Sequence, residues 1–382
     1  MARIELNGLA HAYRPNPAAP SDYALRPMTM TWDDGGAYAL LGPSGCGKTT
    51  LLNIISGLVR PSHGKVLFDG RDVTALPPEQ RNIAQVFQFP VIYDTMTVFD
   101  NLAFPLRNRG WKEAAVRQRV CQVAEMLELT DDLKHRASGL AVDAKQKISL
   151  GRGLVRPDVA AVLFDEPLTV IDPHLKWLLR RKLKQIHHEL KLSLIYVTHD
   201  QVEALTFADQ VVVMTQGEVV QTGSAQALFE EPAHTFVGYF IGNPGMNLLP
   251  CRARDGKILI AGATAQSAHS TALPGTVPET VLLPTGIEAD ARGAAVHSIN
   301  GQLTLGIRPE FIDCSSTARA DALATMTLAV RNMGTHFLGE FKLLDHVIAV
   351  KARTLPTQPG QTAWLHFPPA RTLYYLDDKR VA

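Results

Sequence analysis

The chain has 382 residues, of which 46% are hydrophobic and 20% are charged. These values are typical of soluble globular proteins and exclude a wholly disordered chain, and the length suits roughly two or three domains. Lys and Arg together number 38 and Asp and Glu number 37, so the formal net charge is +1. This balance gives no electrostatic reason to expect nucleic acid as a partner.

Strand-like and helix-like segments alternate over roughly the first 240 residues. In chain order, strands are predicted at Ala37–Leu41, Val66–Phe68, Ala160–Phe164 and Leu192–Val197, and helices at Thr49–Leu58, Trp111–Leu129 and His174–Lys191. The two later helices carry apolar residues every three to four positions. The last two strands are short, continuous apolar runs, which are typical of strands buried on both faces of a parallel sheet. The sequence therefore predicts an α/β fold for this part.

The composition changes near Gly242, where the sequence reads Gly-Asn-Pro-Gly. Scattered Gly, Pro and Thr follow, together with short strand-like segments such as Leu303–Ile307 and Val347–Lys351. This pattern predicts a smaller, mainly β domain of barrel type. We therefore expect two domains, residues 1–240 and 241–382. Because no apolar run approaches the roughly 20 residues that span a bilayer, and no signal-peptide pattern is present, we expect a cytoplasmic chain.

A glycine-rich turn follows the first predicted strand and fits the pattern GxxxxGK[ST], in the strand-to-helix context that this motif requires. The phosphate-binding set predicted from it is Gly42, Pro43, Ser44, Gly45, Cys46, Gly47, Lys48, Thr49 and Thr50. Backbone N–H groups of such a loop surround phosphate oxygens at a helix N-terminus. Lys48 is expected to reach the β- and γ-phosphates, and the Thr49 hydroxyl to bind Mg²⁺. The motif predicts a site for a nucleoside triphosphate.

The apolar strand that begins at Val162 ends in two adjacent carboxylates, Asp165 and Glu166. In a protein with such a phosphate loop, the Asp at this strand end holds Mg²⁺ through its water shell. The Glu is then placed to orient the attacking water or to accept its proton. Taken alone, a strand ending in Asp-Glu usually means only a solvated strand end, but the loop upstream favours the catalytic interpretation.

These segments resemble the ATP-binding subunits of ABC importers, in the maltose/sugar-type branch that carries a C-terminal regulatory domain. The resemblance covers nearly the whole chain. It rests on Tyr13, the phosphate loop, Val86–Gln88, Leu163–Leu168, Asp172, Val197–Ala204, Phe240–Pro244 and Leu305–Glu310. It implies a RecA-like P-loop core with an antiparallel edge sheet and a helical insert at about residues 90–155. The remaining chain is then an all-β, OB-like barrel.

The resemblance also implies roles for four further residues. Tyr13 would stack on the adenine ring of ATP. Gln88 would contact Mg²⁺ or the lytic water and link the site to membrane subunits. His199 would hydrogen-bond the γ-phosphate, and Asp172 would lie at the dimer interface. The segment after Gln88, residues 89–93, would lie near the groove that receives a helix of a membrane subunit.

One segment departs from the family pattern. The family places a Leu-Ser-Gly-Gly-Gln signature at the start of a helix, where it grips the ATP bound to the opposite subunit. Here Ser138 and Gly139 are followed by Leu140, and three extra residues separate them from the helix segment Ser149–Arg156. Ser138 and Gly139 are expected to keep part of the ATP contact. The segment is similar to that of glycerol/polyol-type importers with two non-identical ATPases, so a heterodimer is predicted, and a homodimer stays open.

The sequence thus predicts an ATPase that powers an ABC importer of a small polar solute of the glycerol/polyol or sugar class. The predicted catalytic residues are Lys48, Gln88, Glu166 and His199, and the predicted metal ligands are Thr49, Gln88 and Asp165. The cofactors are ATP and Mg²⁺. The expected partners are membrane-spanning subunits, a second ATPase subunit and, indirectly, an external solute-binding protein, with no nucleic acid. The expected location is the cytoplasmic face of the cell membrane, peripherally.

Two alternatives stay open at this point. The chain could bind ATP and hydrolyse it poorly in an asymmetric heterodimer, because its signature is altered. It could also be an ABC ATPase without a transport role, acting on ribosomes or DNA.

Overall fold

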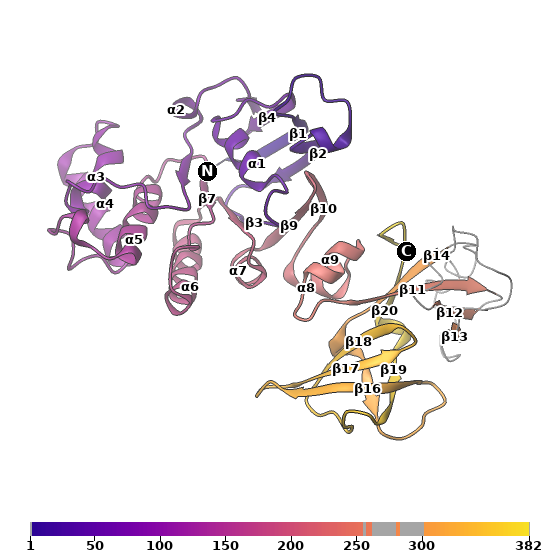
Figure 1. Ribbon diagram of the computed structural model, residues 1–382. Coiled ribbons are helices and arrows are strands. Elements are labelled where there is room, and N and C mark those ends of the chain that lie inside the picture. The colour runs from indigo at the N-terminus through magenta and orange to yellow at the C-terminus, as the bar shows by residue number, and fades with distance from the viewer. Residues whose placement is uncertain (1, 255–256, 262–279, 283–301, 382) are drawn as a thin grey trace. The chain divides into compact units, whose positions relative to one another are not determined.

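The computed structural model describes residues 2–254, 257–261, 280–282 and 302–381 (Figure 1). The chain forms two compact units, Met1–Ala225 and Gln226–Ala382. Among the described residues, no helix is long and apolar enough to cross a membrane.

The first unit is an α/β structure with two sheets. Its strands are β1 (Ile4–His11), β2 (Leu25–Trp32), β3 (Ala37–Leu41), β4 (His63–Phe68), β5 (Arg71–Asp72), β6 (Ala84–Val86), β7 (Val162–Asp165), β8 (Leu194–Thr198), β9 (Gln210–Thr215) and β10 (Glu218–Gly223). Its helices are α1 (Lys48–Ser56), α2 (Pro78–Arg81), α3 (Val98–Arg107), α4 (Glu113–Met126), α5 (Val142–Leu154), α6 (Pro173–Leu190) and α7 (Gln201–Phe207), with 3₁₀ turns at Pro20–Asp22 and Ala137–Gly139. The α/β class predicted from the sequence is confirmed.

A six-stranded sheet runs through this unit in the order β10-β9-β3-β8-β7-β6. The strands from β9 to β6 pair in parallel, and β10 joins β9 in the antiparallel sense. Every residue of β3 and β8 is buried. This burial explains the continuous apolar runs, because a strand covered on both faces has no solvent-facing side.

A four-stranded antiparallel sheet, in the order β2-β1-β4-β5, forms the predicted edge sheet. Its apolar face shares one core with α1 and the six-stranded sheet, as Leu6, Trp32, Leu40, Leu52 and Val212 show. Helix α1 thereby has a fixed position, which also fixes the loop that precedes it.

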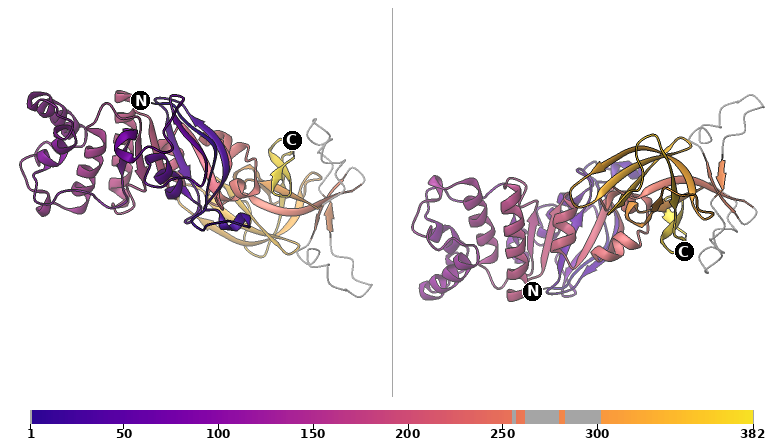
Figure 2. Two further views of the ribbon diagram at one scale, coloured as in Figure 1. Left: turned by 90° about the horizontal axis from the view of Figure 1, so that it is seen from above. Right: turned by 90° about the horizontal axis from the view of Figure 1, so that it is seen from below.

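Helices α3, α4 and α5 lie between β6 and β7 in the chain and form the predicted helical insert. They pack against one another, and both views of Figure 2 show them gathered at one end of the first unit. The buried face of α4 consists of Val116, Val120, Val123 and Ala124. Thr97 caps α3, because its hydroxyl accepts a hydrogen bond from the Asp100 backbone N–H at 3.0 Å.

The second unit is mainly β. Its strands are β11 (Asn247–Arg254), β12 (Lys257–Ala261), β13 (Thr280–Leu282), β14 (Gln302–Ile307), β15 (Asp313–Ser315), β16 (Leu323–Asn332), β17 (Phe337–Leu343), β18 (His346–Ala352), β19 (Thr362–His366), β20 (Thr372–Leu376) and β21 (Lys379–Arg380). They form two antiparallel sheets, in the orders β13-β12-β11-β14-β20-β21 and β15-β19-β16-β17-β18. The two sheets enclose one core, to which Leu305, Phe341 and Leu365 contribute.

The helices α8 (Ala225–Glu230) and α9 (Thr235–Phe240) are tied to this second unit by Arg308. Its buried guanidinium donates hydrogen bonds to the backbone carbonyls of Leu228, Phe229, Gly238 and Ile241. The guanidinium carbon also lies 4.2 Å from the centre of the Phe229 ring. These contacts explain why the compact units divide after Ala225, whereas the sequence suggested a boundary after residue 240.

Candidate functional site

The predicted site residues follow four neighbouring parallel strands, β3, β8, β7 and β6. The phosphate loop follows β3, His199 follows β8, Asp165 and Glu166 end β7, and Gln88 comes shortly after β6. Because the carboxyl ends of parallel strands meet at the same edge of a sheet, the topology brings these segments together. This edge is the candidate site.

The phosphate loop closes tightly on its own backbone. Gly47 is the N-cap of α1 with φ +102°, and a Cβ at this position would lie 2.5 Å from the Ala24 carbonyl oxygen. Only glycine fits such a conformation and such a contact. The Lys48 side chain is buried, and its Nζ donates to the carbonyls of Gly42 at 2.8 Å and Pro43 at 2.9 Å. The ammonium group is thereby held inside the loop, at the N-terminus of α1, where an anion is stabilised.

Thr49 and Asp165 meet although 116 positions separate them, since the Thr49 hydroxyl donates to Asp165 Oδ1 at 3.1 Å. Burial raises the pKa of Asp165, and the neighbouring Glu166 charge adds to this effect, while the Thr49 hydrogen bond and Lys48 oppose it. A hydroxyl and a carboxylate are hard oxygen ligands of the kind that Mg²⁺ prefers. The pair therefore fits a magnesium ion, whose charge would compensate the desolvated carboxylate.

Glu166 contacts both His199 and Thr169. Its Oε2 lies 3.2 Å from His199 Nδ1 and accepts a hydrogen bond from the Thr169 hydroxyl at 3.3 Å. The backbone of Glu166 has φ +47°, a left-handed conformation that non-glycine residues rarely adopt. Such conformations persist where the surrounding structure holds them and are concentrated at functional sites.

The turn that carries His199 is itself fixed by side chains. The Thr198 hydroxyl donates to Glu203 Oε2 at 2.8 Å and accepts from the Asp200 backbone N–H at 3.0 Å. Asp200 caps α7 by accepting from the N–H groups of Val202 and Glu203. His199 therefore lies in a turn whose backbone is fixed by hydrogen bonds. Its side chain is half-exposed and contacts Glu166.

Comparisons with known proteins show which family this chain belongs to. A model of the ABC transporter family matches residues 25–169. The sn-glycerol-3-phosphate import ATP-binding protein UgpC of Salmonella typhimurium is 38% identical over 346 residues, which cover 90% of each chain. UgpC of Escherichia coli K12 shows the same identity over 346 residues and the same coverage. The chain belongs to the ABC transporter family.

Among solved structures, the ABC chain resembles CbiO1 from Clostridium perfringens, part of the ABC transporter complex CbiONQ. The TM-score is 0.54 and the identity 25%, over 60% of this chain and 90% of that chain. The family membership predicted from the sequence and the P-loop ATPase fold are confirmed. The chain is an ATPase of this family.

Of the remaining predicted residues, Tyr13 lies beside the phosphate loop. Its hydroxyl is 3.1 Å from the Thr50 hydroxyl, its ring packs edge-on against His11, and 66% of the residue is exposed. An exposed ring next to the loop is suited to stacking on a base, so adenine stacking stays a prediction that this position supports. Asp172 caps α6 by accepting from the His174 N–H at 2.9 Å, and its predicted interface role is untested.

The altered signature segment is placed differently from the sequence expectation. Ser138 and Gly139 lie in the 3₁₀ turn Ala137–Gly139, and the Ser138 N–H donates to the Asp94 carbonyl at 3.1 Å. Helix α5 begins only at Val142, after an Ala141 N-cap that makes no side-chain hydrogen bond, and Asp143 lies in its first turn. The predicted ATP contact of Ser138 and Gly139 stays a prediction, but the helix start carries other residues.

Sequence reasoning missed two contacts of the ABC site, those of Thr169 and Gln146. The Thr169 hydroxyl donates to a carboxylate whose residue, Glu166, has a left-handed φ that the sequence does not reveal. Gln146 reaches the turn after Glu166 from α5, a contact between segments that no local pattern predicts.

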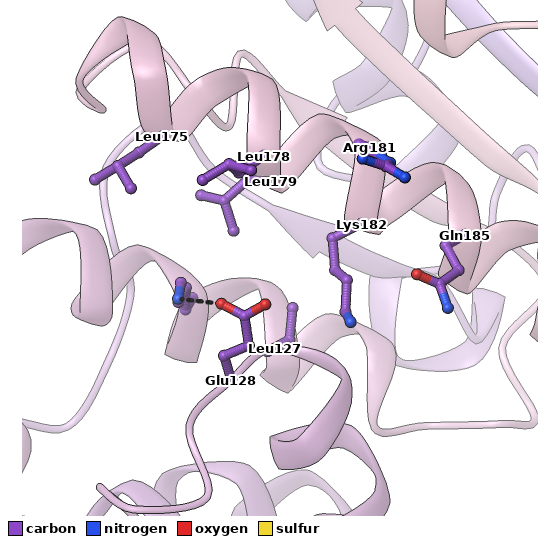
Figure 3. Close-up of a pocket in the computed structure, with 9 residues that line it drawn as sticks. Leu127, Glu128, Leu175, Leu178, Leu179, Arg181, Lys182 and Gln185 are labelled. Atoms are coloured by element: carbon purple, nitrogen blue, oxygen red, sulfur yellow. Dashed lines mark ion pairs between the residues drawn. The ribbon is translucent and has the colours of Figure 1, made fainter.

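A hollow of about 240 Å³ lies between α5, α6 and the residues that directly follow α4 (Figure 3). It is lined by Leu127, Glu128, Lys147, Leu175, Leu178, Leu179, Arg181, Lys182 and Gln185. Lys147 pairs with Glu128 across it at 3.6 Å. Because none of the predicted nucleotide-binding residues lines this hollow, it is not the phosphate site.

Proposed function

We propose that this chain is the ATP-hydrolysing subunit of an importer for a small polar solute of the glycerol-phosphate, polyol or sugar class. The observation that carries the proposal is the meeting of the phosphate loop, Asp165, Glu166 and His199 at one edge of the parallel sheet. The relatives that match over 90% of the chain are sn-glycerol-3-phosphate import proteins, and this supports the solute class.

The geometry suits in-line attack of water on the γ-phosphate. Lys48 and the loop N–H groups bind the phosphates, and Thr49 and Asp165 would hold Mg²⁺, which neutralises charge on the β- and γ-oxygens when bound. Glu166 orients the water and takes its proton. Since Nδ1 of His199 faces Glu166, the other ring nitrogen is left for the γ-phosphate. Catalysis is then mainly positioning and charge stabilisation.

The proposed partners are membrane-spanning subunits, with the chain bound peripherally at the cytoplasmic face of the membrane and an external solute-binding protein acting indirectly. The segment after β6 supports a docking role, because Phe89 is 67% and Val91 52% exposed. Gln88 directly precedes Phe89 in this segment, so its predicted link between the ATP site and the membrane subunits fits its position.

We also infer that the second ATPase subunit is a paralogue with an unaltered signature. In the family resemblance, the start of the signature helix grips the ATP of the opposite subunit. Here that helix start carries Asp143, and an anion in the first turn opposes a second anion at the same place. In a dimer of two copies of this chain, an Asp143 carboxylate would repel the ATP phosphates at both sites. A paralogue would leave this chain's own phosphate loop with an attractive partner.

The function is tested by ATP-dependent uptake in proteoliposomes that contain this chain, a paralogous ATPase subunit, and the membrane subunits and solute-binding protein that copurify with them. Labelled sn-glycerol 3-phosphate, glycerol and maltose are compared. We expect uptake of one of them only with ATP present on the side of this chain. Uptake that is independent of ATP, or no uptake of any polar solute while stable RNA or DNA copurifies, would contradict the proposal and favour a non-transport ATPase.

A further inference from the structure

Gln146 connects helix α5 to the turn that follows the proposed catalytic carboxylate. Its side chain is fully buried, and its Nε2 donates to the Pro167 carbonyl oxygen at 2.6 Å. Pro167 directly follows Glu166 in the chain. None of the roles derived above uses this glutamine.

The turn at Glu166 needs such support, because a non-glycine residue with φ +47° is strained. From the sheet, the Glu166 N–H donates to the Val197 carbonyl at 3.0 Å. Within the turn, the Thr169 N–H donates to the Glu166 carbonyl at 3.2 Å. Gln146 adds a third hydrogen bond, and this one comes from the helical insert.

A hydrogen bond positions its acceptor only if its donor is held in place, and α5 is held firmly. Further along the same helix, Leu150 and Leu154 are buried. Three and six positions after Gln146, Ser149 and Arg152 contact the segment after Gln88. The Ser149 hydroxyl accepts from the Val91 N–H at 3.4 Å, and Arg152 donates to the Val91 carbonyl at 2.6 Å. One helix thus contacts both the segment after β6 and the catalytic turn.

The other end of the Gln146 amide indicates what the residue is for. Its Oε1 is buried and has no hydrogen-bond partner among the described residues. A buried acceptor without a partner destabilises the fold. An apolar side chain of the same length would avoid that cost, so the amide is explained by its bond to Pro167 rather than by packing.

We propose that Gln146 is a positioning residue, which fixes the turn Glu166–Thr169 relative to α5 so that the Glu166 carboxylate meets the attacking water. The proposal rests on the proposed role of Glu166. A misplacement of about 1 Å at a reacting group can lower a rate up to about 100-fold. Loss of this hydrogen bond should therefore lower kcat and leave ATP binding intact.

The test is Gln146→Met, which keeps the length of the side chain and removes the donor. Phosphate release, the KM for ATP and the thermal unfolding temperature are measured on the complex with the partner ATPase and membrane subunits. We expect kcat to fall at least about tenfold, with KM within about twofold of wild type. The matched control is Ile148→Val, which removes a methylene two positions away and should lower the unfolding temperature without changing kcat.

A kcat within twofold of wild type in Gln146→Met would overturn the proposal. So would parallel losses of kcat and ATP affinity, since these would indicate a purely structural role. If Gln146→Met does not fold, Gln146→Asn, whose amide is too short to reach Pro167, is measured with the same expectations. Failure of the proposed function itself is recognised separately, because Glu166→Gln would then keep full turnover.

Discussion

Asp165 is held where its own charge is disfavoured. Burial raises its folded-state pKa, so the stability that this group contributes is present below the unfolded pKa and is lost as pH rises through the folded pKa. At neutral pH the ionised side chain therefore destabilises the nucleotide-free protein. The Thr49 hydroxyl and Lys48 offset part of this effect. Such a carboxylate is explained by the cation that it would bind.

We therefore predict that Asp165→Asn makes the nucleotide-free protein slightly more stable than wild type at pH 7.5, because a desolvated charge is removed and the Thr49 hydrogen bond can be kept. The difference should vanish near pH 4. Addition of Mg·ATP should raise the unfolding temperature of wild type and have little effect on the variant. Differential scanning fluorimetry at both pH values measures this, and a variant that is less stable without nucleotide would contradict it.

At this scale the sequence was informative where a motif has a fixed spacing. Lys48, Thr49, Asp165 and Glu166 are predicted from a strand-to-loop context, and His199 from the family resemblance. The parallel strands lead to one edge of the sheet. The contacts of Thr169 and Gln146 were not predictable. They involve a left-handed backbone torsion and the packing of α5 against the turn, neither of which the sequence reveals.

Among the elements, some helix boundaries are predictable from local patterns and others are not. The helices α4 and α6 agree with their predicted ranges to within about three residues at each end, because a buried apolar face defines them. The start of α5 was not evident, because Ser138-Gly139 resembles a signature and a 3₁₀ turn intervenes. The strands of the second unit were expected only as a barrel-like group. Their division into two sheets follows from long-range pairing, which local patterns do not encode.

The N-terminus of α5 gives a prediction about subunit pairing. With Mg·ATP, the Glu166→Gln protein should stay monomeric alone and form a dimer when mixed with a paralogous ATPase subunit that has an unaltered signature. Adding Asp143→Gly should allow self-dimerisation, because the repulsive anion is removed. Mass in solution, by light scattering after size exclusion, measures this. A matched control is Asp131→Gly, since this exposed acid precedes the 3₁₀ turn and lies outside α5. Self-dimerisation without the Asp143 change would make the heterodimer unnecessary and would fit a retained contact by Ser138 and Gly139.

For the whole molecule, the fold and family follow from the sequence because motifs span most of the chain, and relatives match 90% of it. The identity of the solute does not follow from the sequence, because the ATPase subunit of an importer does not need to contact the solute. The partner is indicated only indirectly, through Asp143. A formal net charge of +1 separates none of these possibilities.

The most direct test of the account is the rate of phosphate release by the complex with Glu166→Gln in this chain alone. ATP binding to the variant is checked first, and it should match wild type, because the phosphate loop is unchanged. We predict a fall in turnover of about 100-fold or more, the contribution typical of a positioned general base. Full turnover in the variant would contradict it, and would leave this chain as a subunit that binds ATP while its partner hydrolyses it.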